Sequence, residues 1–287
     1  MGALRINYNF QANFTHTNLL KNEFFMNKSL ERLATGYRIN RAADDAAGYY
    51  IANQLRTYAV SLDRGIKNAQ DGVSLAQIAQ SALAEVYNIL NDVKSKAIQA
   101  ANETNDDTNR KQLQQDINGL IDAIEKIFSD TEFNGRKVFS TGTQTFTIHY
   151  GGRVDQELAI VVATAAAAGA EGSSTAPATV TIGGTAYTID VTSQTKANNA
   201  VSVVDALIKA VDDMAAKFGA YQIELEKIIS NNQSAKIDTE EAESRIRNVD
   251  FAKEMAEFTR RQILMQSGTA MLAQANQLPQ LVLQLLR

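Results

Sequence analysis

The longest regular pattern in the chain is a heptad stripe of apolar and small residues between Ile51 and Ala100. Steps of alternately four and three residues meet no polar side chain in this segment, which is typical of the contact stripe of a coiled coil. The sequence therefore predicts one helix that begins near Asp45 and is roughly 85 Å long at about 1.5 Å per residue. The stripe residues for which we expect a role in subunit packing are Ile51, Leu55, Leu62, Gly65, Ala69, Gly72, Ala76, Leu83 and Leu90.

The middle of this stripe consists of glycine and alanine. Gly65 and Gly72 each cost about 1 kcal/mol of helix propensity relative to alanine. We expect a packing reason that offsets this cost, because small side chains let a partner segment approach closely.

Weaker versions of the repeat occupy both ends of the chain. At the N-terminal end Glu23 interrupts the stripe, and the C-terminal stripe changes frame once, which is a local adjustment of the supercoil. The end residues for which we expect a role in subunit packing are Leu19, Met26, Leu30, Leu33, Phe251, Met255, Phe258, Leu264, Met271, Leu278 and Leu285.

Between these ends, two further helices and a short β region are predicted. The polar run ETNDD (103–107) predicts a turn, and heptad-spaced apolar residues follow it at 113–127 and again at 201–229. The segments TQTFTIHY and ATVTIGGTAYTIDVT alternate apolar and polar residues and predict β-strands, with Gly-Gly pairs as turns. The small-residue run TAAAAGAEGSSTAPA between them predicts a loop.

The predicted fold class is mainly α: long antiparallel or coiled-coil helices from both termini pack as a bundle, with a small β-hairpin or β insert in the middle. A lone pair of slender terminal helices leaves much of its apolar face in water, and helices are stabilised mostly by packing such a face. We therefore expect the ends to be poorly ordered or aggregation-prone in the monomer and ordered in a polymer.

Composition narrows the range of functions. The 287 residues carry a formal net charge of only −4, which argues against nucleic acid as a partner. The chain has no cysteine, and its two prolines, Pro177 and Pro279, leave the long N-terminal helices uninterrupted. No apolar run is long enough for a membrane span. The start MGALRINYNF lacks a secretory signal pattern, so a specialised export route stays open.

The motifs of common enzymes and cofactor sites do not occur. The sequence has no P-loop, GxGxxG or HExxH pattern, and His16 and His149 lie too far apart in sequence to suggest a metal site. Asp44 and Asp45 resemble a pair for acid/base work, but their place at a predicted helix start favours interaction with the helix dipole. We expect no enzyme activity, no cofactor and no bound metal.

Several long runs resemble one protein family. LERLATGYRINRAADDAAGYYIANQL (30–55) and NAQDGVSLAQIAQSAL (68–83) are similar to N-terminal blocks of bacterial flagellins. SRIRNVDFAKEMAEFTRRQILMQSGTAMLAQANQLPQLVLQLLR (244–287) is similar to the C-terminal block, including its closing Leu-Leu-Arg. The resemblance covers about 1–140 and 200–287.

The resemblance implies a structural subunit that polymerises into the flagellar filament for motility. It implies an inner coiled-coil core domain from 1–44 and 247–287, and a helical-bundle domain with a β-hairpin from 45–162 and 198–246. Residues 163–197 would form a small surface insert. The alternatives are a hook–filament junction protein of the flagellum, or a secreted enzyme with an insert between flagellin-like ends.

The resemblance also implies partners and a location. The main partner is a further copy of the chain, in a helical homopolymer. Others are an export chaperone that holds the C-terminal helix, the cap, and the hook-junction proteins. The family is secreted through the flagellum's own channel and forms the extracellular flagellum.

Two surface features complete the sequence-based expectations. Flagellins sensed by the flagellin-recognising Toll-like receptor carry an Arg-Val-Arg-Glu-Leu-Ala-Val-type run, which Asp92 and Lys96 change in charge or polarity; we expect weak binding to this host receptor. Many flagellins carry O-linked sugars, and the candidate positions here are Ser140, Thr141, Thr143, Ser173, Ser174 and Thr175.

Overall fold

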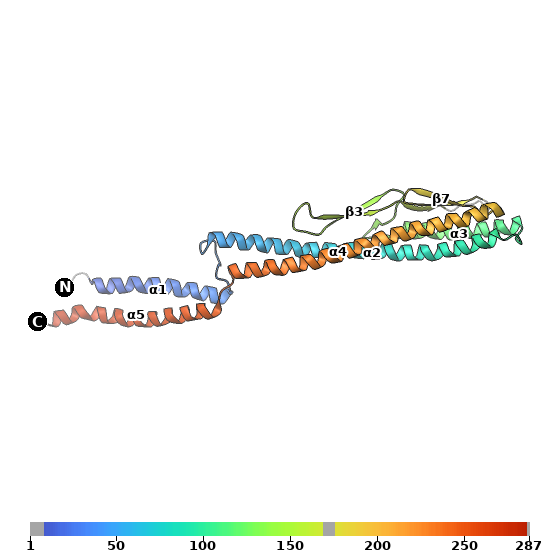
Figure 1. Cartoon of the computed structure of the whole chain (residues 1–287). Helices are drawn as coiled ribbons and strands as arrows, with labels where there is room; N and C mark the ends of the chain where they lie inside the picture. The colour runs from blue at the N-terminus through green and yellow to red at the C-terminus, as the bar shows by residue number, and fades with distance from the viewer. Residues whose placement is uncertain (1–8, 169–175, 286–287) are drawn as a thin grey trace. The chain divides into compact units, whose positions relative to one another are not determined.

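The computed structural model describes residues 9–168 and 176–285, with side chains described as far as residue 277. Five helices carry most of this part of the chain (Figure 1). They are α1 (Phe10–Thr35), α2 (Ala46–Ala101), α3 (Asp107–Asp130), α4 (Gln194–Arg247) and α5 (Phe251–Leu285). The predicted mainly α-helical class is confirmed, and so is the turn between the second and third helices.

Seven short strands form three antiparallel sheets in the described part of the chain. They are β1 (Glu132–Phe133), β2 (Arg136–Lys137), β3 (Gln144–His149), β4 (Glu157–Val162), β5 (Ala165–Ala168), β6 (Ala178–Ile182) and β7 (Thr185–Ile189). β1 pairs with β2, β3 with β4, and the third sheet has the order β5-β6-β7. Gly183 and Gly184, both with positive φ, make the turn between β6 and β7, as predicted for this Gly-Gly pair.

The chain divides into two compact units, which are described separately. Unit 1 contains the described residues up to Ala59 and from Ile237 onward, and unit 2 contains Val60–Lys236. Unit 1 therefore holds α1, α5 and the adjoining ends of α2 and α4, while unit 2 holds the rest of these two helices, α3 and all the strands. The three-part division expected from the family resemblance stays a prediction.

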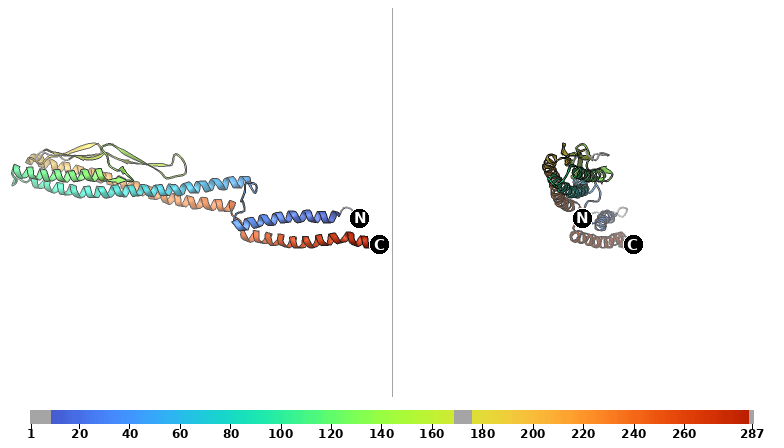
Figure 2. Two further views of the ribbon diagram at one scale, coloured as in Figure 1. Left: turned by 180° about the vertical axis from the view of Figure 1, so that it is seen from behind. Right: turned by 90° about the vertical axis from the view of Figure 1, so that its right-hand side faces the viewer.

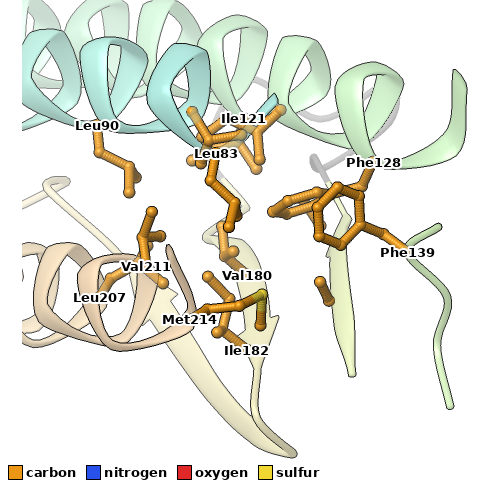
Figure 3. Close-up of a cluster of buried hydrophobic side chains, with 14 of the residues drawn as sticks. Leu83, Leu90, Ile121, Phe128, Phe139, Val180, Ile182, Leu207, Val211 and Met214 are labelled. Atoms are coloured by element: carbon orange, nitrogen blue, oxygen red, sulfur yellow. The ribbon is translucent and has the colours of Figure 1, made fainter. Parts of the chain in front are cut away.

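Unit 2 has a continuous apolar core. The heptad stripe of α2 is buried from Leu62 to Ala100 and packs against stripes of α3 and α4. Figure 3 shows Leu83 and Leu90 of α2 among side chains from α4 and from β6. The strands lie along one side of these helices (Figures 1 and 2), and their inward side chains complete the core.

The two glycines of the α2 stripe have an evident packing reason. A Cβ at Gly65 would lie 2.1 Å from the carbonyl oxygen of Tyr150, and one at Gly72 would lie 3.0 Å from Leu225 of α4. The segment between β3 and β4 is held there by amides, since Asn68 donates to the His149 carbonyl at 2.8 Å and Asn232 donates to the Tyr150 carbonyl at 2.6 Å. The small residues thus admit a β-hairpin onto α2.

The prediction of a loop for the whole of TAAAAGAEGSSTAPA is wrong at Ala165–Ala168, which form β5. Alanine has little intrinsic preference for strands, but here the segment pairs with β6 and lies against α3. Two amide side chains of α3 hold the neighbouring segment: Gln114 accepts from Val191 at 2.7 Å, and Asn118 donates to Ala176 at 3.2 Å. The strand β4 was not predicted, because ELAIVV lacks a clean alternation.

Candidate assembly surface on the terminal helices

Helices α1 and α5 of unit 1 lie side by side and run antiparallel (Figures 1 and 2). Three polar contacts fix the register. Asn9 donates to the Ala275 carbonyl at 2.8 Å, Asn22 donates to the Arg261 carbonyl at 2.8 Å, and Arg32 pairs with Glu254 at 3.5 Å. The start of α1 therefore lies beside the later part of α5, and the end of α1 lies beside the start of α5.

The contact between α1 and α5 combines polar and apolar side chains. Among the side chains described on these two helices, Asn22, Ser29, Glu254 and Ala275 are fully buried, and the larger Leu19, Met26, Leu33 and Phe258 are half-buried. Asn22 Oδ1 and Glu254 Oε1 are buried without a hydrogen-bond partner in the described chain. A helix pair that stood alone would normally bury its largest apolar side chains instead.

Eleven large apolar side chains of this pair face outward. Phe10 is 67% exposed and Met271 is 62% exposed, and nine others on the two helices are at least 45% exposed. On α5, Met255, Ile263 and Leu264 line a shallow apolar hollow. The exposed set is Phe10, Phe14, Leu20, Phe24, Phe25 and Leu30 on α1, and Phe251, Met255, Ile263, Leu264 and Met271 on α5. We call these eleven residues the terminal apolar surface.

The structure places the predicted packing residues of the two ends in different environments. Leu30, Phe251, Met255, Leu264 and Met271 belong to the terminal apolar surface, whereas Leu19, Met26, Leu33 and Phe258 are half-buried. The side chains of Leu278 and Leu285 lie outside those that the structure describes.

Six residues of the terminal apolar surface lie outside the single stripe that the sequence analysis followed along each helix. They are Phe10, Phe14, Leu20, Phe24, Phe25 and Ile263. A count of apolar residues around the whole helix circumference would have found them.

The predicted packing residues of α2 lie mostly inside the chain itself. Ile51 is exposed and Leu55 is half-buried in unit 1. The others are buried within unit 2: Leu62, Gly65, Ala69, Gly72, Ala76, Leu83 and Leu90. Their described neighbours belong to the same subunit, and contact with a second subunit stays a prediction.

The segment between α1 and α2 is organised by two carboxylates. Asp44 pairs with Lys28 of α1 at 2.7 Å and accepts the backbone N–H groups of Asn40 and Arg41. The hydrogen bond from Lys28 is the main cause that lowers the pKa of Asp44 from 3.8 to about 2. Asp45 accepts from the backbone N–H of Gly48 at 3.0 Å, at the start of α2. Both aspartates therefore have structural partners, in line with the interpretation as helix-start residues.

The segment that follows α1 also contacts the segment that joins α4 to α5. The backbone N–H of Arg38 donates to the Arg247 carbonyl at 2.7 Å, and Tyr37 and Asn248 form a short antiparallel bridge. The guanidinium of Arg247 lies 4.4 Å from the centre of the Tyr37 ring. These contacts fix the entry and exit of α1 and α5 within unit 1.

The remaining residues singled out in the sequence are spread over unit 2. Asp92 is exposed, and Lys96 pairs with Asp116 of α3 at 2.8 Å. Ser140 is half-buried, and Thr141 and Thr143 are exposed; Ser173, Ser174 and Thr175 lie outside the described residues. His149 contacts Glu157 at 3.1 Å on the surface.

None of the described residues form a group of three or more His, Cys, Asp or Glu side chains placed to hold a metal ion. Among the described helices, none combines the length and apolarity that crossing a bilayer requires.

Comparison with known proteins gives matches to bacterial flagellins. The bacterial flagellin N-terminal helical region matches residues 6–145, and the flagellin C-terminal helical region matches residues 201–286. The flagellin of Halalkalibacterium halodurans is 40% identical over 98% of this chain and 99% of its own length. For the flagellin of Bacillus subtilis the identity is 39%, over 99% of this chain and 100% of the relative.

One solved structure is also similar in part. The crystal structure of Bacillus cereus flagellin matches with a TM-score of 0.44 at 23% identity, over 58% of this chain and 88% of that chain.

A pair of terminal helices that leaves eleven large apolar side chains exposed is typical of a self-associating structural protein. The sequence comparisons make the family explicit: the chain belongs to the bacterial flagellins. It is a structural subunit of the flagellar filament, and the alternatives of a junction protein and of an enzyme with an insert are not favoured.

Proposed function

We propose that the terminal apolar surface is the main contact through which this chain polymerises with further copies of itself. The observation that carries the proposal is the exposure of the α1–α5 pair, in which eleven large apolar side chains face water and, among the described side chains, the one fully buried apolar residue is Ala275. Contiguous exposed apolar surface of this kind marks an interaction site.

The size of the effect supports a polymer. Full burial of one large apolar side chain is worth about 1.5–3 kcal/mol, and eleven such side chains are exposed on this pair. Only part of that gain remains as binding free energy, because association also costs translational and side-chain freedom.

In this proposal, 1–44 and 247–287 form the inner core domain, 45–162 and 198–246 surround it, and 163–197 is a surface insert.

A charged residue on this surface tests the proposal. We expect Leu264→Glu to reduce polymerisation of the purified full-length chain by tenfold or more, because a buried carboxylate without a partner costs several kcal/mol. Electron microscopy and sedimentation measure filament formation. Because Leu264 is 49% exposed, the helix content of the monomer should not change.

The matched control is Val154→Glu, which places the same charge on an exposed valine in the segment between β3 and β4. This variant should still form filaments. Normal filaments from Leu264→Glu would rule out a role for this part of the surface in subunit packing.

We also propose that the same surface is protected before assembly. The exposed face of α5 matches what an export chaperone would cover to prevent early association, and the cap and hook-junction proteins would contact the ends of the polymer. Secretion through the flagellum's own channel accounts for a chain that assembles outside the cell and contains no cysteine.

Recognition by the host receptor is a separate proposal. In unit 2, exposed Asp92 presents a negative charge, and the Lys96 ammonium is engaged by Asp116 at 2.8 Å. A receptor surface that fits an arginine and a leucine at these positions would lose those contacts. We expect the unchanged chain to activate the receptor only weakly in a cell reporter assay. The double variant Asp92→Arg, Lys96→Leu should activate it at doses closer to those at which ordinary flagellins do. A strong response of the unchanged chain would contradict this.

O-glycosylation is proposed for the exposed hydroxyl groups of Thr141 and Thr143, and for Ser140 beside them. These residues precede β3 in an irregular segment that a transferase can reach. Ser173, Ser174 and Thr175 remain candidates from the sequence alone. The intact mass of filament protein tests the proposal: sugar adds mass to the bare chain, and a mass equal to that of the bare chain would end it.

A further inference from the structure

The turn between β1 and β2 consists of Asn134 and Gly135. Their φ angles are 52° and 74°, and Asn134 is the one non-glycine with positive φ among the residues that the structure describes. The paired residues Phe133 and Arg136 flank them directly, so the hairpin has a two-residue loop. Two consecutive positive φ values at Asn-Gly are typical of a type I′ hairpin turn. Both residues are exposed.

An asparagine that precedes a glycine can react with the backbone of that glycine. The backbone nitrogen of the next residue can attack the side-chain amide carbon, and glycine hinders this approach least because it has no Cβ. At Gly135 the surrounding space is open, since a Cβ placed there would meet nothing within 4 Å. We infer that Asn134 is a site of spontaneous deamidation.

The atoms of this step balance without an oxidant. A bond forms between the Gly135 nitrogen and Asn134 Cγ, the Gly135 nitrogen gives up its proton through water to Nδ2, the bond from Cγ to Nδ2 breaks, and Nδ2 leaves as ammonia. Water then opens the resulting succinimide ring at either carbonyl. The products are aspartate in the normal main chain, or isoaspartate with one extra main-chain carbon.

The chain contains a second Asn-Gly pair that the fold protects. Asn118 and Gly119 lie within α3, where the helix ladder holds the backbone. Asn118 is 6% exposed, accepts a hydrogen bond from Gln114 at 2.8 Å, and donates one to the Ala176 carbonyl at 3.2 Å. The helix and the side-chain hydrogen bonds therefore keep Asn118-Gly119 out of the reactive geometry, whereas Asn134-Gly135 is exposed to solvent.

The hairpin around Asn134 is short enough to open. Each of its strands has two residues, and few backbone hydrogen bonds have to break for the turn to change its dihedral angles. Outside the turn, the Arg136 guanidinium lies 4.5 Å from the centre of the Phe146 ring, and Val138 is buried. Deamidation places a new carboxylate beside Arg136, or lengthens the two-residue loop, while the adjoining core stays in place.

Peptide mass spectrometry of the purified full-length chain, aged in mildly alkaline buffer, tests the inference. We expect the peptide with Asn134 to gain the mass change of deamidation at least about tenfold faster than the peptide with Asn118, because only the former is exposed and in a weakly held segment. Isoaspartate in the first peptide is scored by enzymatic methyl transfer. In urea both peptides should convert at similar rates, since the protection of Asn118 depends on folding.

The variant Asn134→Gln provides the control, because its longer side chain does not readily form the five-membered ring. It should lose the mass change in this peptide and leave the rate at Asn118 unaltered. Two results would overturn the inference: an intact Asn134 in the folded chain under conditions where the urea-treated chain converts, or equal rates at Asn118 and Asn134 in the folded chain.

Discussion

At the scale of single residues, several charged side chains hold neighbouring segments of the backbone in place. Asp44 gathers Lys28 and two backbone N–H groups. Arg110, which is buried, reaches from α3 to the carbonyls of Ala100 and Asn102 at the end of α2, where a positive charge is favourable. The sequence predicted that Asp44 and Asp45 belong to a helix start. It did not reveal Lys28 as the partner of Asp44, because that contact depends on how the chain turns after α1.

The Asp44 contacts predict a dependence of stability on pH. The pKa of Asp44 is lowered from 3.8 to about 2 by the Lys28 hydrogen bond, so its stabilising effect is present above pH 3.8 and is lost as the pH falls toward 2. We expect Asp44→Asn to reduce the free energy of unfolding by about 1–2 kcal/mol at neutral pH. Denaturant unfolding of the monomer measures it. The difference from the unchanged chain should shrink toward pH 2, and a difference that does not depend on pH would contradict the assignment.

At the scale of elements, heptad spacing predicted the long helices well, because one uninterrupted apolar stripe is a strong signal. The stripe of α2 is buried from Leu62 to Ala100. The strands were harder to predict. Ala165–Ala168 form β5 because they pair with β6 and lie against α3. A run of alanines alone does not indicate these tertiary contacts. The reason for Gly65 was likewise hidden, since Tyr150 is far away in the sequence.

Two glycines on helices should respond in opposite ways to the same substitution. In Gly65→Ala the new Cβ would lie 2.1 Å from the Tyr150 carbonyl oxygen, so we expect a loss of about 1–3 kcal/mol from overpacking despite better helix propensity. In Gly119→Ala the Cβ meets nothing within 4 Å, and a gain of about 0.5–1 kcal/mol is expected. Thermal or denaturant unfolding compares them. If Gly65→Ala and Gly119→Ala changed stability equally, close packing of the β3–β4 hairpin against Gly65 would be contradicted.

At the scale of the molecule, the two units complete their cores differently. Unit 2 buries the stripes of α2, α3 and α4 within one chain. In unit 1, the described side chains of α1 and α5 that are fully buried are few, and four predicted packing residues, Leu19, Met26, Leu33 and Phe258, are only half-buried, while eleven other large apolar side chains are exposed. The sequence predicted terminal helices with too little cover of their own. It did not predict the direction in which each side chain faces, because apolar residues lie on several sides of α1 and α5.

The small amount of fully buried apolar surface between α1 and α5 has a thermodynamic consequence. Ala275 is the one fully buried apolar residue among the described side chains of the two helices, so we expect most of the free energy that stabilises these helices to come from contact with a neighbouring subunit. By mass action, their stability rises with subunit concentration, whereas the stability of unit 2, whose core is complete within one chain, is set by its own sequence. A single polypeptide thus contains one part that obeys a folding equilibrium and another that obeys an association equilibrium.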